Sequence, residues 1–226
     1  MRFNILLPLL MIPKVFGFSF NAPKKYIGYK QIRQTFKDFY IDNQDYTLEH
    51  VVPQSLFKEN KKLKNDMHNL IWYPPKINSH RSNFKYESDI KFDENSMILD
   101  EEGKELTYSN PVGDNGISIK RKKKRLFIPN KIYRGEISRA CMYFLTTYPE
   151  YKGEILDKVI DPYTILTWHH EYPVNELEYD KEMVVKEKQG NYNDFIKNPA
   201  ILVPVMEDIL KKKLDFFKNY DYKIEM

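Results

Sequence analysis

LEHVVPQSLFKENKKLKNDMHNLIWYPPKINSHRSN, residues 48–83, is the stretch on which the interpretation of this chain depends. It opens with a Glu-His pair and carries two further histidines and several asparagines. The β-branched pair Val51-Val52 and the stop at Pro53 are typical of a short strand, with the polar pair at its start. A lysine-rich loop follows, and Leu70–Tyr73 predicts a second short strand.

Pro74-Pro75 ends that strand and is suited to open a helix, because proline is tolerated in a first helical turn. Asn78, Arg81 and Asn83 are expected on this helix, where Asn78 and Arg81 are three residues apart and share a face. The predicted order is therefore strand, loop, strand, helix.

The polar residues of this stretch suggest phosphodiester chemistry. A neutral His50 has a reference pKa near ~6.5 and can take a proton from water, although a hydrogen-bonded strand histidine is the alternative. Glu49 suits a hard divalent cation, and Asn78 offers a second oxygen; a surface carboxylate and a turn asparagine are the alternatives. Two ligands are few, but magnesium keeps waters and takes oxygens from phosphate.

Three further residues have two interpretations each. Arg81 either stabilises negative charge on a phosphate or forms a salt bridge that holds the helix to the hairpin. His68 and Asn69 either orient His50 through hydrogen bonds or are structural. Neighbouring strand residues point to opposite faces, so Glu49 and His50 serve one site only at a strand end, a bulge or the strand's edge.

Six sequence words, in one order, resemble those of the bacterial endonuclease I family of metal-dependent nucleases. The resemblance covers about residues 26 to 200. The words are EHVVPQS at 49–55, DMHNL at 66–70, NSHRSN at 78–83, FIP at 127–129 with GEISRA at 135–140, WHHEYPV at 168–174, and QGNYNDFI at 189–196.

The resemblance implies a ββα-metal finger, as in the His-Me finger nucleases, and a divalent metal, Mg²⁺ first and Mn²⁺ or Ca²⁺ next. It also implies little sequence preference and 5′-phosphate products. It places Asn83 and Arg139 among the residues that support the site, a salt bridge being the alternative for Arg139. The chain departs from the family at His80, where an acid is usual. It also has no arginine between Arg33 and Arg81, where some members carry one.

Composition sets the outer limits. The 226 residues suffice for one domain with a sizeable core, and no linker or repeat divides them. The formal net charge of +4 does not by itself indicate a nucleic-acid binder. Cys141 is the only cysteine, which excludes an intrachain disulfide and a cysteine-based zinc site. On a predicted helix over 135–148 it is expected to be buried as a small hydrophobe.

Residues 1–20 have an early basic residue and a short apolar run, too short to span a membrane. They are expected to be a cleaved signal peptide or an apolar N-terminal arm. A signal peptide would make the protein secreted or extracytoplasmic, and otherwise it is intracellular. Residues 21–226 form the predicted nuclease domain.

Two runs of positive charge suggest contact with a polyanion. Lys120, Arg121, Lys122, Lys123, Lys124 and Arg125 are consecutive, and such a run attracts nucleic-acid backbone; a nuclear address and a solvated loop are the alternatives. The lysines of 58–64 are interpreted equally well as a phosphate-attracting loop or a solvated one. His169-His170-Glu171 is not expected to bind metal, because adjacent helical residues do not face each other.

We therefore expect a helix-rich α+β fold in one domain, with the ββα finger set into it. The expected protein is a monomeric, metal-dependent endonuclease acting on DNA, with RNA as a further candidate, and His50 is its general base. The alternative is a catalytically inactive nucleic-acid-binding protein that keeps the fold. A metal- or polyanion-binding surface protein is a third candidate.

Overall fold

The computed structural model describes residues 20–58, 60–87, 97–99, 105–106, 117–121 and 124–211. The predicted signal peptide or arm therefore lies outside the described residues, apart from Phe20. The helices are α1 (Tyr29–Phe39), α2 (Gln54–Phe57), α3 (Lys61–Lys64), α4 (Pro75–Arg81), α5 (Lys131–Thr147), α6 (Lys152–Lys158), α7 (Pro162–Glu171), α8 (Glu176–Gln189), α9 (Asp194–Lys197) and α10 (Leu202–Leu210). Short 3₁₀ turns are η2 (Met67–Asn69), η3 (Pro149–Tyr151) and η4 (Pro199–Ile201).

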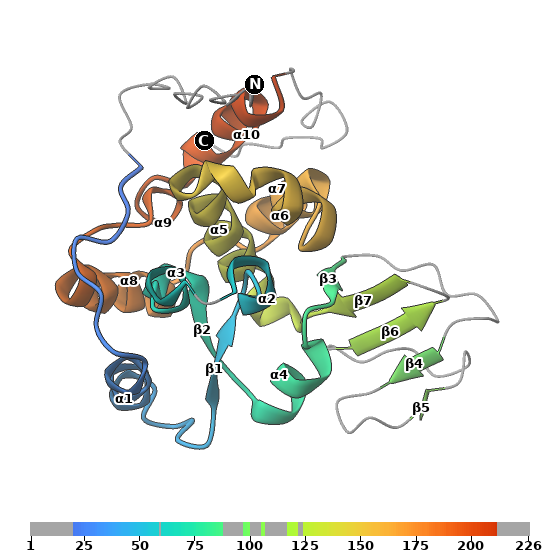
Figure 1. Ribbon diagram of the computed structural model, residues 1–226, viewed down its shortest axis with the longest axis horizontal. Coiled ribbons are helices and arrows are strands. Elements are labelled where there is room, and N and C mark those ends of the chain that lie inside the picture. Colours follow the sequence, from blue (N-terminus) through green and yellow to red (C-terminus); the bar gives the residue numbers. More distant parts are fainter. Residues whose placement is uncertain are drawn as a thin grey trace, which may run out of the picture.

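The strands form two sheets. Strands β1 (Thr47–His50) and β2 (Leu70–Tyr73) pair antiparallel, with Glu49 opposite Ile71 and His50 opposite Leu70. A five-stranded sheet has the order β3-β7-β6-β4-β5, formed by β3 (Lys85–Tyr86), β4 (Met97–Leu99), β5 (Glu105–Leu106), β6 (Ile117–Arg121) and β7 (Lys124–Ile128). This sheet extends to one side of the helical body, beyond α4 (Figure 1). The fold is helix-rich and α+β, as the sequence predicted.

The predicted strand-loop-strand-helix order is present, with three local corrections. The first strand ends at His50 instead of running to Val52, so Glu49 and His50 stand at its end and not at its start. The lysine-rich segment is not an open loop, because α2 and α3 lie within it. Asn83 lies past the end of α4, two residues after Arg81.

Asn69 explains why the strand stops at His50. Its side chain accepts from the Val52 amide at 2.8 Å and donates to the Val52 carbonyl at 3.0 Å. Its own carbonyl accepts from the Val51 amide at 3.0 Å. These bonds replace the next ladder partners, and buried backbone groups must find partners of some kind. The chain therefore turns away at Val51, and Glu49 and His50 can serve one site.

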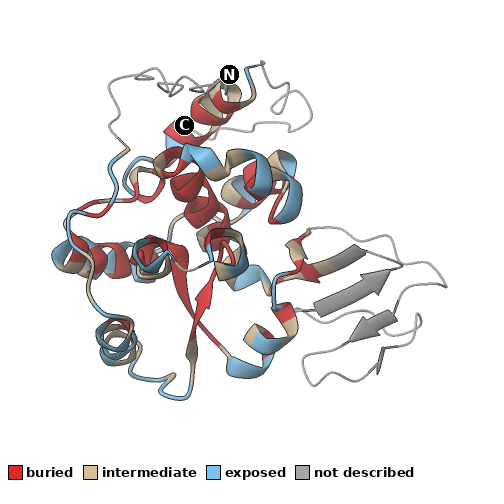
Figure 2. Cartoon of the chain, viewed as in Figure 1, coloured by how far each residue is buried: buried red, intermediate tan, exposed pale blue. Residues whose placement is uncertain are grey.

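The core is built around α5. Buried residues concentrate in β1, β2 and the central part of α5 (Figure 2). Cys141 has no exposed surface and lies in this core, as predicted. Burial raises the pKa of its thiol to about 12, which makes it unreactive at neutral pH.

A buried carboxylate, Asp66, ties the segment between β1 and β2 to the helices α5 and α8. It accepts hydrogen bonds from the hydroxyls of Tyr143 at 2.9 Å and Tyr148 at 2.7 Å. The Gln189 amide at the end of α8 donates to it at 3.1 Å, as does the His68 backbone amide. Asp66 has no exposed surface, so it serves as the buried acceptor that these donors share.

Replacing Asp66 by Ala should lower the free energy of unfolding by about 3–5 kcal/mol, because it leaves several buried donors without an acceptor. Urea denaturation followed by circular dichroism measures this. Asp161→Ala is the control. Asp161 caps α7 by accepting from the Thr164 amide at 3.0 Å and from the Thr164 hydroxyl at 2.6 Å, and its loss should cost about 1 kcal/mol. Equal losses in the two variants would contradict the central role of Asp66.

Candidate functional site

The end of β1, the start of α2 and the helix α4 enclose a cavity of about 340 Å³. Its lining includes Glu49, His50, Gln54, Asn78, Arg81 and Asn83. The four residues predicted for catalysis and metal binding, at positions 49, 50, 78 and 81, are thus gathered in one place although up to 32 residues separate them in the chain.

His50 is held through both ring nitrogens. Its Nε2 lies 2.9 Å from the Lys64 carbonyl oxygen, and its Nδ1 lies 3.0 Å from Gln54 Nε2. A carbonyl only accepts, so Nε2 carries the proton and Nδ1 is the acceptor. Burial lowers the pKa of His50 to about 4, with the charges of Lys64 and Arg81 acting in the same direction. His50 is therefore neutral at pH 7 and keeps a basic lone pair on Nδ1.

A tyrosine from α1 covers the imidazole. The rings of Tyr29 and His50 stack with centroids 6.0 Å apart and planes 7° from parallel. Ile32 and Phe36 of the same helix pack in a cluster with Leu48 on β1, which places Tyr29 over the imidazole. The sequence did not indicate that α1 contributes to the site, because hydrophobic periodicity does not reveal a ring contact between residues that are 21 positions apart.

Glu49 and Arg81 form a buried ion pair. Arg81 Nη1 donates to Glu49 Oε1 at 2.7 Å and to the His50 carbonyl at 2.9 Å, while Nη2 donates to the Val51 carbonyl at 2.6 Å. Its guanidinium also lies 4.5 Å from the ring centre of Tyr86. Arg81 is 1 % exposed, and its terminal nitrogens are committed to the end of β1. The salt bridge that was one of the two interpretations of Arg81 is therefore present.

The pKa of Glu49 shows how strongly the site is desolvated. Burial raises it to about 7, against the lowering effect of the Arg81 charge and hydrogen bond. A second positive charge in the cavity would favour the carboxylate form.

Asn78 offers one oxygen toward the same cavity. Its Nδ2 donates to Thr47 Oγ1 at 3.1 Å and to the Leu48 carbonyl at 3.2 Å. Both partners accept hydrogen bonds from the side-chain nitrogen, so the side-chain oxygen of Asn78 is the atom available to a ligand. Glu49 and Asn78 thus fit a cation that prefers hard oxygen donors. Among the described residues, no group of three or more His, Cys, Asp or Glu side chains is placed to hold a metal ion.

Two of the residues predicted to support the site, Asn69 and Asn83, lie at it, and a third, His68, contacts α8 instead. Asn69 fixes the backbone after His50 by its hydrogen bonds to Val52. His68 does not contact His50: its Nδ1 lies 3.3 Å from Glu182 Oε2 on α8, and its ring packs 4.5 Å from Tyr143. Asn83 is exposed at the cavity.

Arg139 lies away from this cavity. Its Nε and Nη2 donate to the two carboxylate oxygens of Glu178, at 2.6 and 2.5 Å, and Nη1 donates to the Tyr172 carbonyl at 3.0 Å. Gly135 lies beneath this contact, and a Cβ there would overlap with the Tyr172 carbonyl. Arg139 lines a second, larger cavity of about 570 Å³, with walls from Tyr40, Trp72 and the ends of α5 and α8. That cavity contains none of the residues predicted for catalysis or metal binding.

The run from Lys120 to Arg125 spans the adjoining ends of β6 and β7, where Arg121 pairs with Lys124. Lys122 and Lys123 lie outside the described residues, and only the backbone of the other four is described. Nucleic-acid contact by this run stays a prediction.

A family model described as Endonuclease I matches residues 18–200 of the chain. This match covers most of the 226 residues, and the chain belongs to the Endonuclease I family. Membership indicates a nuclease, a hydrolase whose substrate is nucleic acid. No curated protein matches the chain in a comparison of sequences. None of the described helices has the length and hydrophobicity needed to cross a membrane.

The environment of His169 leads to a prediction about pH. Its Nδ1 lies 3.4 Å from Arg139 Nη1, and its Nε2 lies 3.0 Å from the Pro199 carbonyl. Burial and the Arg139 charge lower its pKa to about 4, so folding favours the neutral ring. The associated stability is present above pH ~6.5 and is lost as the pH falls toward 4.

We expect the wild-type protein to lose about 2 kcal/mol more stability than His169→Gln between pH 7.5 and pH 4.5. The comparison cancels the other titrating groups, and chemical denaturation at each pH measures it. If the two proteins lose stability in parallel, His169 is not the titrating group.

Proposed function

We propose that this protein is a metal-dependent, largely sequence-non-specific endonuclease that hydrolyses DNA or RNA to 5′-phosphate products. The observation that carries the proposal is the state of His50: a neutral imidazole, fixed by a carbonyl on Nε2, with the acceptor Nδ1 beside a cavity that also holds a carboxylate and an amide oxygen. This is the state that a general base needs before the reaction starts.

In the proposed reaction, Nδ1 of His50 takes the proton of a water that attacks the scissile phosphorus. The new bond joins the water oxygen to phosphorus, and the bond from phosphorus to the 3′ oxygen breaks. Gln54, which donates to Nδ1 in the structure, holds that lone pair in place until water takes its position. The pKa of about 4 allows the base to stay unprotonated at neutral pH.

Glu49 and Asn78 are the proposed metal-holding residues, and Mg²⁺ is the first candidate, with Mn²⁺ or Ca²⁺ next. A bound divalent ion would neutralise the phosphate and stabilise the departing 3′ oxygen. Arg81 supports this site by fixing Glu49, because its Nη1 and Nη2 already bond to the carboxylate and to backbone carbonyls. We propose that β1, β2 and α4 together form the ββα-metal finger.

The remaining parts of the proposal concern the whole chain. Residues 21–226 are proposed to act as one monomeric nuclease unit, and residues 1–20 as a signal peptide that directs it out of the cytoplasm. The substrate is bound through its sugar-phosphate backbone, which suits an enzyme without sequence preference.

Nicking of supercoiled plasmid tests the function directly. The wild-type protein should nick DNA with Mg²⁺ and stop when a chelator is added, and His50→Ala should be slower by about 100-fold or more. His170→Ala, an exposed histidine on α7, should behave as wild type. DNA binding without nicking under any divalent metal would instead support the inactive binding protein.

Tyr29 should matter to the rate through the orientation of His50. Tyr29→Ala should lower the maximal cleavage rate by about 3–10-fold, since one good ring contact is worth roughly 0.5–1.5 kcal/mol. Tyr29→Phe should keep most of the rate, because the ring and not the hydroxyl makes the stack.

Tyr40→Ala is the matched control. Tyr40 stacks on Trp72 with centroids 6.3 Å apart and planes 7° from parallel, nearly the geometry of Tyr29 on His50, but without contact to the base. It should lose comparable stability and keep its cleavage rate. A loss of rate shared by both Ala variants would reduce the role of Tyr29 to general packing.

A further inference from the structure

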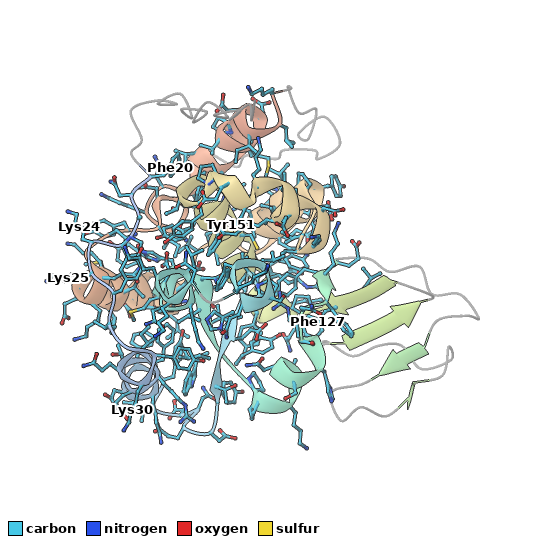
Figure 3. All side chains as sticks on the ribbon, viewed as in Figure 1. Phe20, Lys24, Lys25, Lys30, Phe127 and Tyr151 are labelled. Atoms are coloured by element: carbon cyan, nitrogen blue, oxygen red, sulfur yellow. The ribbon has the colours of Figure 1, made fainter. Side chains whose placement is uncertain are left out.

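The residues before and within α1 form an edge of positive charge. Between residues 20 and 37 there is no Asp or Glu. The same segment carries Lys24, Lys25, Lys30, Arg33 and Lys37, which we call the basic edge. The first four are exposed, and Lys37 is half-buried. Figure 3 shows Lys24, Lys25 and Lys30 along one side of the molecule, opposite the side where Phe127 marks the five-stranded sheet.

The charges on α1 form a stripe. Lys30, Arg33 and Lys37 are spaced three and four residues apart, so they share one face of the helix. The opposite face is apolar and buried through Ile32 and Phe36. From Lys30 to Lys37 the stripe is about 10 Å long, which corresponds to roughly three nucleotides of one strand of a duplex.

The side chains of the basic edge form no ion pair among the described residues. In the described part of the chain, the ion pairs of lysine lie elsewhere, at Lys158 with Glu154, Lys181 with Glu136 and Lys188 with Glu187. The chain as a whole has a net charge of only +4, and Asp38 is the only acid in α1, so the segment has a local excess of positive charge. Exposed cations outside ion pairs attract a polyanion over several ångströms.

Contacts with α3 connect the basic edge to a second group of lysines. Asn65, directly after α3, donates to the Ile27 carbonyl at 3.0 Å. Lys64 Nζ lies 5.5 Å from the ring centre of Tyr29. Lys61 and Lys62 of α3 are exposed beside this junction.

The same junction touches the catalytic histidine. The Lys64 carbonyl accepts a hydrogen bond from His50, and the ring of Tyr29, the first residue of α1, stacks on the His50 imidazole. Positive charge therefore continues from α1 across α3 to the wall of the site. Figure 1 places α2, β1 and α4 between α1 on one side and the sheet that carries the Lys120–Arg125 run on the other.

We propose that the basic edge and α3 bind the sugar-phosphate backbone of the substrate on one side of the bond to be cut. This inference rests on the proposed nuclease function and adds the path of the substrate to it. The strand runs along the charged face of α1, passes α3 and enters the cavity at His50. The contacts are to phosphates, so they add affinity without sequence preference.

The test uses a charge-removal variant, Lys30→Gln with Arg33→Gln and Lys37→Gln, in a His50→Ala background, in which cleavage of the probe should be slower by about 100-fold or more. Gln keeps the helix propensity of α1 high. Binding of a fluorescent 20-base-pair duplex is measured by anisotropy from 50 to 300 mM salt. We expect Kd to rise about 10–100-fold at 100 mM salt. The slope of log K against log salt should become shallower by about 2–3, as for the loss of three phosphate contacts.

The matched control removes three lysines away from the basic edge: Lys152→Gln, Lys158→Gln and Lys197→Gln, on α6 and α9. It changes net charge equally, and its Kd should change less than about threefold. Equal weakening in both triple variants would overturn the proposal, because net charge alone would then explain binding. Thermal unfolding confirms that both variants are folded.

Two further measurements separate this inference from the proposed function. With His50 intact, the α1 variant should show its loss in KM and not mainly in kcat. If the wild-type protein cuts DNA and the α1 variant binds and cuts like it, the inference is wrong and the proposed function stands. If the wild-type protein does not cut, the function is wrong and duplex binding still decides the inference. If the α1 variant lost binding to vesicles that contain anionic lipid but bound the duplex like the wild type, the inference would also be overturned.

Discussion

The buried pair of Arg81 and Glu49 is the interaction on which the site depends. It joins α4 to the end of β1 through one charged contact and through hydrogen bonds to the His50 and Val51 carbonyls. A guanidinium that is 1 % exposed needs partners for its charge and its donors. The end of β1 supplies three acceptors, and the Ser82 carbonyl supplies a fourth. In return, Arg81 fixes the carboxylate and the backbone on either side of His50. Asn78, one turn earlier on α4, is thereby brought to the same cavity.

His50 is restrained on every side by different elements. The carbonyl of Lys64, the last residue of α3, accepts a hydrogen bond from Nε2. Gln54 at the start of α2 donates to Nδ1, and Tyr29 of α1 stacks on the ring face. Phe57 adds a tilted contact at 6.3 Å. Three helices, α1, α2 and α3, must pack beside β1 before the imidazole has one position, so His50 is oriented by tertiary structure and not by β1 alone.

The sequence predicted the parts of the site that are local. The strand-strand-helix order, the gathering of Glu49, His50 and Asn78, and the burial of Cys141 follow from short-range pattern and family words. The end of β1 was misplaced because Val51-Val52 has high strand propensity, while Asn69, 17 positions later, captures the backbone of Val52. Tyr29 was missed for a similar reason: only the packing of α1 against β1 brings it to His50.

Residues in the later family words stabilise the region around the site through hydrogen bonds and an ion pair. Gln189 bonds to Asp66 and Met67, and Asn191 bonds to the Tyr143 hydroxyl. Arg139 and Glu178 close a second buried pair between α5 and the start of α8. These residues hold the hairpin on its helical support, so a change in them would disturb the site from a distance. The proposed path of the substrate does not depend on such fixed contacts, because binding to phosphates needs only positive charge, which the lysines of α1 and α3 and Arg33 carry.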